Sequence, residues 1–281
     1  YSLFEDNKHN IWIGTDNGVT HYNGITFTEY PISNEYSTLV SSIAQDNNGT
    51  LWATTPNAIY YLKNQQWELF VSNNTELNDN INCLFIDNDG VIWVGNDNGL
   101  FKIIDNHVTR YTTASGLSSN KISAICKVDE ILLVGTSGRG VNINDQNGWK
   151  VIGNPSEIVK HLFIDDNKDL WISTQANGAI KYNLKKNSST TYNQKKGLSV
   201  NNVNLILQDN WKNMWFGTSG GGINKYHGQQ FQHYTKKEGY LDEIFYSVLG
   251  GSDNTVWTGT GHLGFAEMRN DSIVYHNQNT D

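Results

Sequence analysis

A few charged residues stand where the surrounding sequence pattern does not call for them. Lys160 and His161 interrupt the strand-like run EIVKHLFID. An ammonium and an imidazole at this place could bind an anion or a polar ligand. Alternatively, the histidine could be satisfied inside the core while the lysine reaches solvent. Arg139, in the loop TSGRG, could hold a carboxylate or sugar hydroxyls through its guanidinium, or could simply be solvated.

Three carboxylates, Glu157, Asp242 and Glu243, lie in segments that precede strand-like runs. Paired carboxylates are the catalytic groups of many glycosidases. Asp242 and Glu243 are adjacent in sequence, however, and no motif places a second carboxylate opposite them. The motifs GxSxG and HExxH and the Walker loop are also missing from the sequence. We therefore expect no catalytic residues and no enzymatic activity in this segment.

An unusual tryptophan and a further histidine complete the candidate set. Trp211 lies in the turn DNWKN, where its indole could stack on a sugar, contact a partner, or pack against an adjacent turn. His262 lies in a loop near the end of the chain. The predicted ligand-binding residues are Arg139, His262, Lys160, His161, Glu157, Glu243 and Trp211.

Two acidic turns resemble the start of a calcium loop. They are DNDG at 87–90 and DDNKD at 165–169. The distal glutamate of such a loop is missing, and in short hairpins these residues commonly hydrogen-bond their own backbone. The sequence therefore predicts no metal site, and no motif points to a cofactor.

The candidate residues are carried by a repeat of about 40 residues. A motif of the form apolar-Trp-x-small-Thr recurs as IWIGT (11–15), LWATT (51–55), IWVGN (92–96), LLVGT (132–136), LWIST (170–174), MWFGT (214–218) and VWTGT (256–260). We interpret its tryptophans as structural: Trp12, Trp52, Trp93, Trp171, Trp215 and Trp257. Leu133 takes this position in the fourth repeat.

Each repeat has the pattern of four short strands. Each repeat contains, in this order, an apolar run, an Asp/Asn/Gly turn, the Trp strand, a loop ending in Gly, a third strand and an aromatic fourth strand. A sheet of this size cannot bury both faces alone, and seven such sheets stacked around an axis make a β-propeller. We predict an all-β fold, a seven-bladed β-propeller with four antiparallel strands per blade, spanning 1–281 as a single domain.

This architecture gives the repeated residues structural roles. Each Trp would fill the gap to the next blade, and the Gly two places later would permit close approach of the sheets. In the fourth repeat, we expect Trp149 to offset the smaller Leu133. Connections between blades, together with the loops between second and third strands, would share one face, which we call the blade-linking face. Longer loops often carry function, so we expect the ligand there.

The repeats resemble those of the two-component regulator propeller family. The resemblance rests on GLSSNKISAI (116–125), GLSVNNVNLILQD (197–209), DNDGVIWVGNDNGL (87–100) and WFGTSGGGINKY (215–226). It extends over all seven repeats. The second repeat departs from the pattern at Thr54 and Ala58, and the fourth lacks the Trp.

Membership of this family would imply a sensor module rather than an enzyme. The resemblance implies a periplasmic or extracellular location in a membrane-anchored regulator, and in many members a response to carbohydrate. We expect an oligosaccharide or small polar ligand, and contact with neighbouring domains of the same signalling protein. The sequence leaves open whether the chain forms a homodimer. The alternatives are a lyase or glycoside hydrolase of propeller fold and a pure protein-interaction scaffold.

Composition excludes several other functions. Lys plus Arg is 20 and Asp plus Glu is 28, so the net charge is −8, which disfavours nucleic acid and anionic membrane surfaces. No run of 18 apolar residues is present, so we expect no membrane contact within this segment. Cys83 and Cys126 lie in apolar runs and are expected to be buried free thiols. Because the chain opens inside a strand-like run, we expect it to be a fragment of a longer sensor protein.

Overall fold

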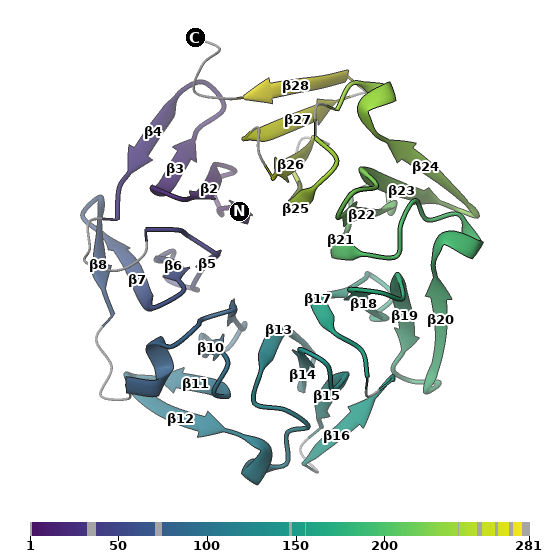
Figure 1. Ribbon diagram of the computed structural model, residues 1–281. Helices are drawn as coiled ribbons and strands as arrows, with labels where there is room; N and C mark the ends of the chain where they lie inside the picture. Colours follow the sequence, from purple (N-terminus) through teal and green to yellow (C-terminus); the bar gives the residue numbers. More distant parts are fainter. Residues whose placement is uncertain are drawn as a thin grey trace. The chain divides into compact units, whose positions relative to one another are not determined.

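The strands of the chain form seven four-stranded sheets (Figure 1). The computed structural model describes residues 2–32, 38–70, 75–145, 148–154, 156–240, 242–251, 255–261, 264–269 and 272–276. The chain divides into two compact units, Tyr1–Ser156 with four of the sheets and Glu157–Asp281 with three. All strand pairs within the sheets are antiparallel, and the predicted fold class, a seven-bladed β-propeller with four antiparallel strands per blade, is confirmed.

The sheets of the first unit are built from sixteen strands. They are β1 (Ser2–Glu5), β2 (Ile11–Thr15), β3 (Gly18–Tyr22) and β4 (Phe27–Tyr30); β5 (Ser42–Gln45), β6 (Leu51–Thr55), β7 (Ala58–Lys63) and β8 (Gln66–Leu69); β9 (Cys83–Ile86), β10 (Ile92–Gly95), β11 (Leu100–Ile104) and β12 (His107–Tyr111); β13 (Ile122–Val128), β14 (Ile131–Thr136), β15 (Val141–Asn144) and β16 (Trp149–Ile152).

The second unit contributes twelve strands in the same order. They are β17 (Val159–Ile164), β18 (Leu170–Thr174), β19 (Ala179–Asn183) and β20 (Ser188–Tyr192); β21 (Val203–Gln208), β22 (Met214–Thr218), β23 (Ile223–His227) and β24 (Gln230–Tyr234); β25 (Phe245–Gly250), β26 (Val256–Thr260), β27 (Phe265–Arg269) and β28 (Ser272–His276). Helices in the described residues are four short 3₁₀ turns: η1 (Thr75–Asn78), η2 (Thr113–Ser115), η3 (Gln194–Lys196) and η4 (Lys236–Glu238).

In five of the sheets, the turn before the Trp strand is built around one aspartate. Asp87 accepts the backbone N–H groups of Asp89 and Val91 on Oδ1, each at 3.0 Å, and the indole Nε1–H of Trp93 on Oδ2 at 3.2 Å. The same indole-to-carboxylate bond joins Trp12 to Asp6, Trp52 to Asp46, Trp171 to Asp165 and Trp215 to Asp209, at 2.7 to 3.0 Å. In the two calcium-like turns, the first carboxylate is therefore already engaged by its own turn and its own tryptophan.

Tryptophan side chains fill the space between neighbouring sheets within each unit. Trp93 packs in one cluster with Ile122 and Ile125 of the next sheet, and Trp215 packs in another with Phe245. The indoles of Trp12, Trp93, Trp171, Trp215 and Trp257 are 2–8% exposed, and Trp52 is half-buried. Burial of these large aromatic rings supplies much of the packing free energy of the interfaces that contain them.

Close approach of neighbouring sheets explains the small residue two places after the Trp. A Cβ added at Gly95 would lie 2.5 Å from Cγ2 of Ile122 and 2.6 Å from Sγ of Cys83. Both distances are far inside van der Waals contact. A larger residue at Gly95 would therefore push β13 of the next sheet away.

The predicted compensation in the fourth sheet is wrong. Leu133 is fully buried, but Trp149 packs with the cluster that contains Leu132 and Val134 and lies edge-on to Tyr111 of the preceding sheet. Successive side chains of a strand point to opposite faces, so Trp149 covers the face of the sheet opposite to Leu133. Its indole supports the third and fourth sheets against each other instead.

Replacing one interface indole should be far more costly than replacing the exposed one. Trp93→Ala removes a buried ring and leaves a cavity, so we expect the free energy of unfolding to fall by about 3–5 kcal/mol. Trp211→Ala is the matched control: Trp211 is 53% exposed, and its loss should change stability by no more than about 0.5 kcal/mol. Urea denaturation of both variants measures the difference, and equal losses would contradict the packing role.

The turn aspartates should make stability depend on acid pH. Burial by itself would raise their pKa, but hydrogen bonds from the indole and the backbone outweigh it and hold the pKa of Asp6, Asp87 and Asp165 below the ordinary value. An unfolded aspartate titrates near about 3.9, so this stability is complete above that pH and is lost as pH falls through the lower native pKa. Chemical denaturation as a function of pH should show this fall, and Asp165→Asn should reduce it.

Candidate functional site

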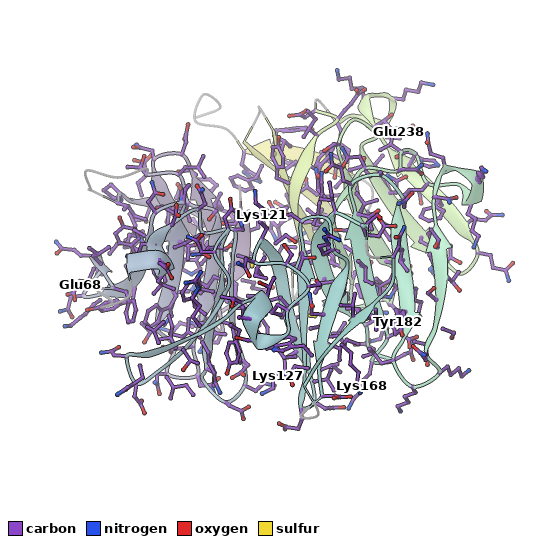
Figure 2. All side chains as sticks on the ribbon, turned by 60° about the horizontal axis from the view of Figure 1, so that its bottom comes forward. Glu68, Lys121, Lys127, Lys168, Tyr182 and Glu238 are labelled. Atoms are coloured by element: carbon purple, nitrogen blue, oxygen red, sulfur yellow. The ribbon has the colours of Figure 1, made fainter. Side chains whose placement is uncertain are left out.

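The two ends of the sheets differ in how they are built. Within each unit, one end carries the blade-linking face and the other carries the short Asp/Asn/Gly turns. Figure 2 shows Lys121 and Lys127 at opposite ends of the same sheet, close to the blade-linking face and to the turns, respectively. The residues predicted to bind a ligand can therefore be assigned to one end or the other.

Capped 3₁₀ turns form several connections of the blade-linking face. The Thr112 side chain accepts the N–H of Ala114, Gly116 closes η2 in the left-handed region with φ of 103°, and the buried Leu117 follows. Asn120 Oδ1 then accepts the N–H of Thr113 at 2.8 Å. Gly197 with Leu198, and Gly239 with Tyr240, repeat the left-handed cap and the buried residue. The G-L-x-x-N motif therefore has a structural role, because it stabilises these connections.

Lys160 is the extra residue of a β-bulge at the start of β17. Val159 pairs with Thr174 and His161 pairs with Ser173, which leaves Lys160 without a partner in β18. A bulge redirects a side chain out of the regular alternation of a strand. The half-buried Lys160 ammonium donates to Oδ1 of Asn202 and Asn204, both at 2.7 Å.

The amides that hold Lys160 belong to a network across three sheets of the second unit. Asn204 Oδ1 also accepts the hydroxyl of Ser219 at 3.1 Å, and its Nδ2 donates to the carbonyl of Phe245 at 2.7 Å. No carboxylate among the described residues pairs with Lys160. Burial lowers the pKa of Lys160, because it disfavours the charged form of the amine.

His161 is bound to the backbone of the next sheet. Its Nδ1 accepts the N–H of Ile206 at 3.4 Å, and burial lowers the pKa of the imidazole to about 4. The ring is therefore neutral near pH 7 and carries its proton on Nε2. At that pH it cannot supply a second positive charge beside Lys160.

The predicted carboxylates serve different loops of the second unit. Glu157 is 6% exposed, and its Oε1 accepts Nδ2 of Asn177 at 2.7 Å. Glu243 is tied through its backbone carbonyl, which accepts the N–H of Gly220 at 2.9 Å. Asp242 accepts the N–H of Glu243 on Oδ1 at 2.8 Å and so holds its own turn. The Glu157 contact orders the loops around the start of β17, and the contacts of Asp242 and Glu243 order those around the start of β25.

Arg139 lies in the first unit, on the loop between β14 and β15. Its backbone N–H donates to Thr136 Oγ1 at 3.1 Å, and its carbonyl accepts the hydroxyl of Ser118 at 3.1 Å. The exposed guanidinium has no partner among the described residues. The loop is therefore fixed while the charged group is free to interact with another molecule.

The two remaining candidates do not join this group. Trp211 lies in the turn between β21 and β22, at the end opposite to the blade-linking face, where 53% of it is exposed. His262 lies outside the described residues. Lys160, Glu157 and Glu243 thus share the blade-linking face of the second unit, and Trp211 belongs to a different surface.

Sequence reasoning missed the amide residues that hold Lys160. Asn202, Asn204 and Ser219 are common loop residues and carry no motif of their own. The repeat offers one comparison, because Asn82 before β9 occupies the position that Lys160 has in β17. The Nδ2 of Asn82 donates to the carbonyl of Ile122 in the next sheet at 2.9 Å. A lysine at that repeated position is expected to reach toward the next sheet as well.

The site is suited to noncovalent recognition of polar groups. An ammonium that already donates to two amide oxygens retains a third N–H for a hydroxyl or carboxylate, and amide side chains both donate and accept. Within the described ranges, no three His, Cys, Asp or Glu side chains are grouped so that they could hold a metal ion. The described helices are all too short and too polar to span a bilayer.

A family comparison agrees with the repeats read from the sequence. The model of the two-component regulator propeller matches residues 1–17, 75–98 and 197–220. No curated protein sequence matches the chain.

Solved propellers of two kinds are similar to the chain. The extracellular domain assigned to a hybrid two component system of B. thetaiotaomicron is 18% identical with a TM-score of 0.82, covering 96% of this chain and 39% of that one. A similar domain assigned to a one component system of the same organism is 20% identical with a TM-score of 0.81, covering 95% and 38%. The chain therefore spans less than two fifths of either structure.

An enzyme also shares the fold. A catalytically inactive virginiamycin B lyase from Staphylococcus aureus, solved with quinupristin, is 16% identical with a TM-score of 0.78, covering 95% of this chain and 93% of that one. At such identities the likeness of all three structures shows the fold alone.

The buried imidazole should lower stability in mild acid. Histidine in an unfolded chain titrates near about 6.5, whereas His161 titrates at about 4. Protons then bind the unfolded chain first, so this stability is complete above about pH 6.5 and declines as the pH falls toward 4. NMR titration should find His161 neutral at pH 5, and His161→Gln should flatten the pH dependence of unfolding in this window. A native His161 that titrates near 6.5 would contradict the assignment.

Proposed function

We propose that this chain, which carries two-component regulator propeller repeats, is the ligand-recognition part of an extracytoplasmic sensor and is not itself catalytic. It would bind an oligosaccharide or another small polar ligand on the blade-linking face. Neighbouring domains of the same signalling protein, or a second copy, would receive the signal. The similarity to extracellular domains assigned to signalling systems supports the location and the role.

One observation carries the ligand assignment: the half-buried ammonium of Lys160 is held by two amide oxygens without a neutralising carboxylate in the described residues. Such a group is costly to keep in a purely structural role, because burial disfavours its charge. A ligand hydroxyl or carboxylate that accepts the remaining N–H would recover part of this cost. Charge-assisted hydrogen bonds of this kind are stronger than neutral ones.

Local contacts favour binding over catalysis. A propeller lyase needs a general acid or base, which is most often a histidine. His161 instead accepts a backbone N–H, and Glu157 accepts the Asn177 amide. Both groups are used in holding loops and strands together.

The network also suggests how occupancy could be transmitted. Lys160, Asn204 and the carbonyl of Phe245 connect the first strands of three successive sheets. A ligand bound to Lys160 would compete for the amides and alter the packing of these strands. The equilibrium would shift only by the difference in ligand affinity between the two states.

A thermal-shift screen tests this proposal. The wild type is screened against a panel of oligosaccharides, and any compound that raises Tm is tested again on Lys160→Met and Lys185→Met. The first variant should bind at least about tenfold more weakly, since one hydrogen bond to a charged group contributes about 1.5–3 kcal/mol. Lys185 is exposed in the turn between β19 and β20, so Lys185→Met changes the net charge equally and should bind like the wild type.

Two results would defeat the proposal. One is an equal loss of affinity in both variants, which would indicate only a general charge effect. The other is cleavage of a polysaccharide, or of quinupristin, by the purified chain, which would favour a propeller lyase or glycoside hydrolase. Arg139→Ala, tested in the same way, asks separately whether the free guanidinium of the first unit takes part.

A further inference from the structure

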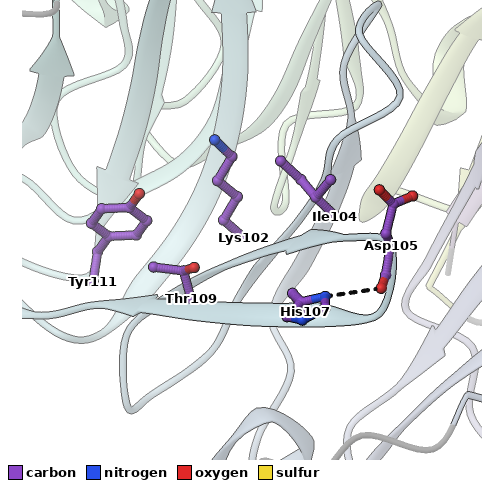
Figure 3. Close-up of a pocket in the computed structure, with 6 residues that line it drawn as sticks. All are labelled: Lys102, Ile104, Asp105, His107, Thr109 and Tyr111. Atoms are coloured by element: carbon purple, nitrogen blue, oxygen red, sulfur yellow. Dashed lines mark hydrogen bonds between the residues drawn. The ribbon is translucent and has the colours of Figure 1, made fainter.

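A groove on the third sheet, in the first unit, has the chemistry of a second ligand site, and none of its lining residues is among the ligand-binding residues predicted from the sequence. Its cavity has a volume of about 340 Å³ and is lined by Lys102, Ile104, Asp105, His107, Thr109 and Tyr111 (Figure 3). All six residues come from the hairpin of β11 and β12. Ligand pockets begin at about 300 Å³, so the groove suits a short ligand.

The register of the hairpin explains why these side chains converge. Lys102 pairs with Thr109, and Ile104 pairs with His107. Directly opposed residues of an antiparallel pair lie on the same face of the sheet, as do residues two apart along a strand. Lys102, Ile104, His107, Thr109 and Tyr111 therefore share one face, and Asp105 borders it from the turn.

Among the described residues, no carboxylate pairs with the ammonium of Lys102. In the fifth sheet, the equivalent Lys181 forms ion pairs of 3.0 Å with Asp165 and Asp169. In the third sheet, the equivalent Asp87 is instead paired with Lys127 of β13 at 3.1 Å, and Val91 stands where the fifth sheet has Asp169. Within the part of the chain that the structure describes, the ammonium of Lys102 contacts only the face of Trp93, 5.5 Å from the ring centroid.

The other polar groups of the groove are equally available. Among the described residues, the Asp105 carboxylate and the hydroxyls of Thr109 and Tyr111 have no hydrogen-bonding partner. His107 uses only Nδ1, at 3.2 Å from the carbonyl of Asp105. The groove thus presents donors and acceptors together, with one positive and one negative charge, beside the exposed apolar side of Ile104.

We propose that this groove binds a neutral saccharide of a few sugar rings. Sugar hydroxyls both donate and accept, which matches the mixture of ammonium, carboxylate, imidazole and hydroxyl groups. A net negative ligand is disfavoured because Asp105 offsets the charge of Lys102. The apolar C–H face of a sugar ring would contact Ile104. This site is separate from the blade-linking face and does not depend on the proposed function there.

Calorimetry with defined trisaccharides tests the groove. The probes are neutral trisaccharides of glucose, mannose, galactose and xylose, with a galacturonate trisaccharide as the charged probe. We expect one or more neutral probes to bind the wild type, with affinity reduced at least tenfold in Lys102→Met and several-fold in Thr109→Val. Lys225→Met is the matched control, because Lys225 lies over Trp215 at 5.0 Å in the same strand position of the sixth sheet; it should bind like the wild type.

The outcomes separate the two sites. Loss of binding in Lys160→Met, but not in Lys102→Met, would assign the saccharide to the blade-linking face and overturn the groove. Absence of binding by all neutral probes, or tighter binding of the galacturonate probe, would overturn it as well. Loss in Lys102→Met alone supports the groove, whether or not Lys160 binds anything. Urea denaturation of each variant shows that it remains folded.

Discussion

The hydrogen bond between a turn aspartate and the indole six residues later is the contact on which the rest of the structure depends. One carboxylate oxygen holds the backbone of the turn, and the other orients the ring that fills the space to the next sheet. Turn geometry and packing between sheets are thereby coupled through a single side chain. Because a buried carboxylate must be fully hydrogen-bonded, replacing the turn aspartate disturbs both. Five of the seven sheets carry this bond in the described residues.

Two sheets depart from the repeated pattern of turn, tryptophan and loop residues. The last sheet has Gly251 in place of the turn aspartate, and the side chain opposite Trp257 is Glu267 rather than a lysine. In the second sheet, Ala58 replaces the loop glycine. In the same loop, Thr55 Oγ1 is buried without a partner among the described residues, whereas Thr136 and Thr174 donate to a glycine carbonyl. Both sheets nevertheless keep all four strands.

The two proposed sites lie at repeated positions where the chemistry of the side chain or of its partners changes. Asn82 and Asn204 each use a neutral amide to reach the backbone of the next sheet. Lys160 occupies the same position with a charge, and so brings an N–H toward the blade-linking face that an amide would not. Lys102 likewise differs from Lys181, because Asp87 is paired with Lys127 and Val91 stands where the fifth sheet has Asp169. Both proposed sites thus arise from small changes on an otherwise regular scaffold.

Sequence alone was sufficient for the sheets, because their determinants are local. The Asp-x-x-Gly turns, the alternation of apolar residues and the spacing of the tryptophans predict seven sheets of four strands, as observed. Side-chain partners from different sheets were not predictable in this way. Lys160 meets amides 42 and 44 residues away, and Trp149 covers the face opposite to Leu133. Such contacts depend on how neighbouring sheets approach and on where a bulge redirects a side chain, so only the tertiary structure decides them.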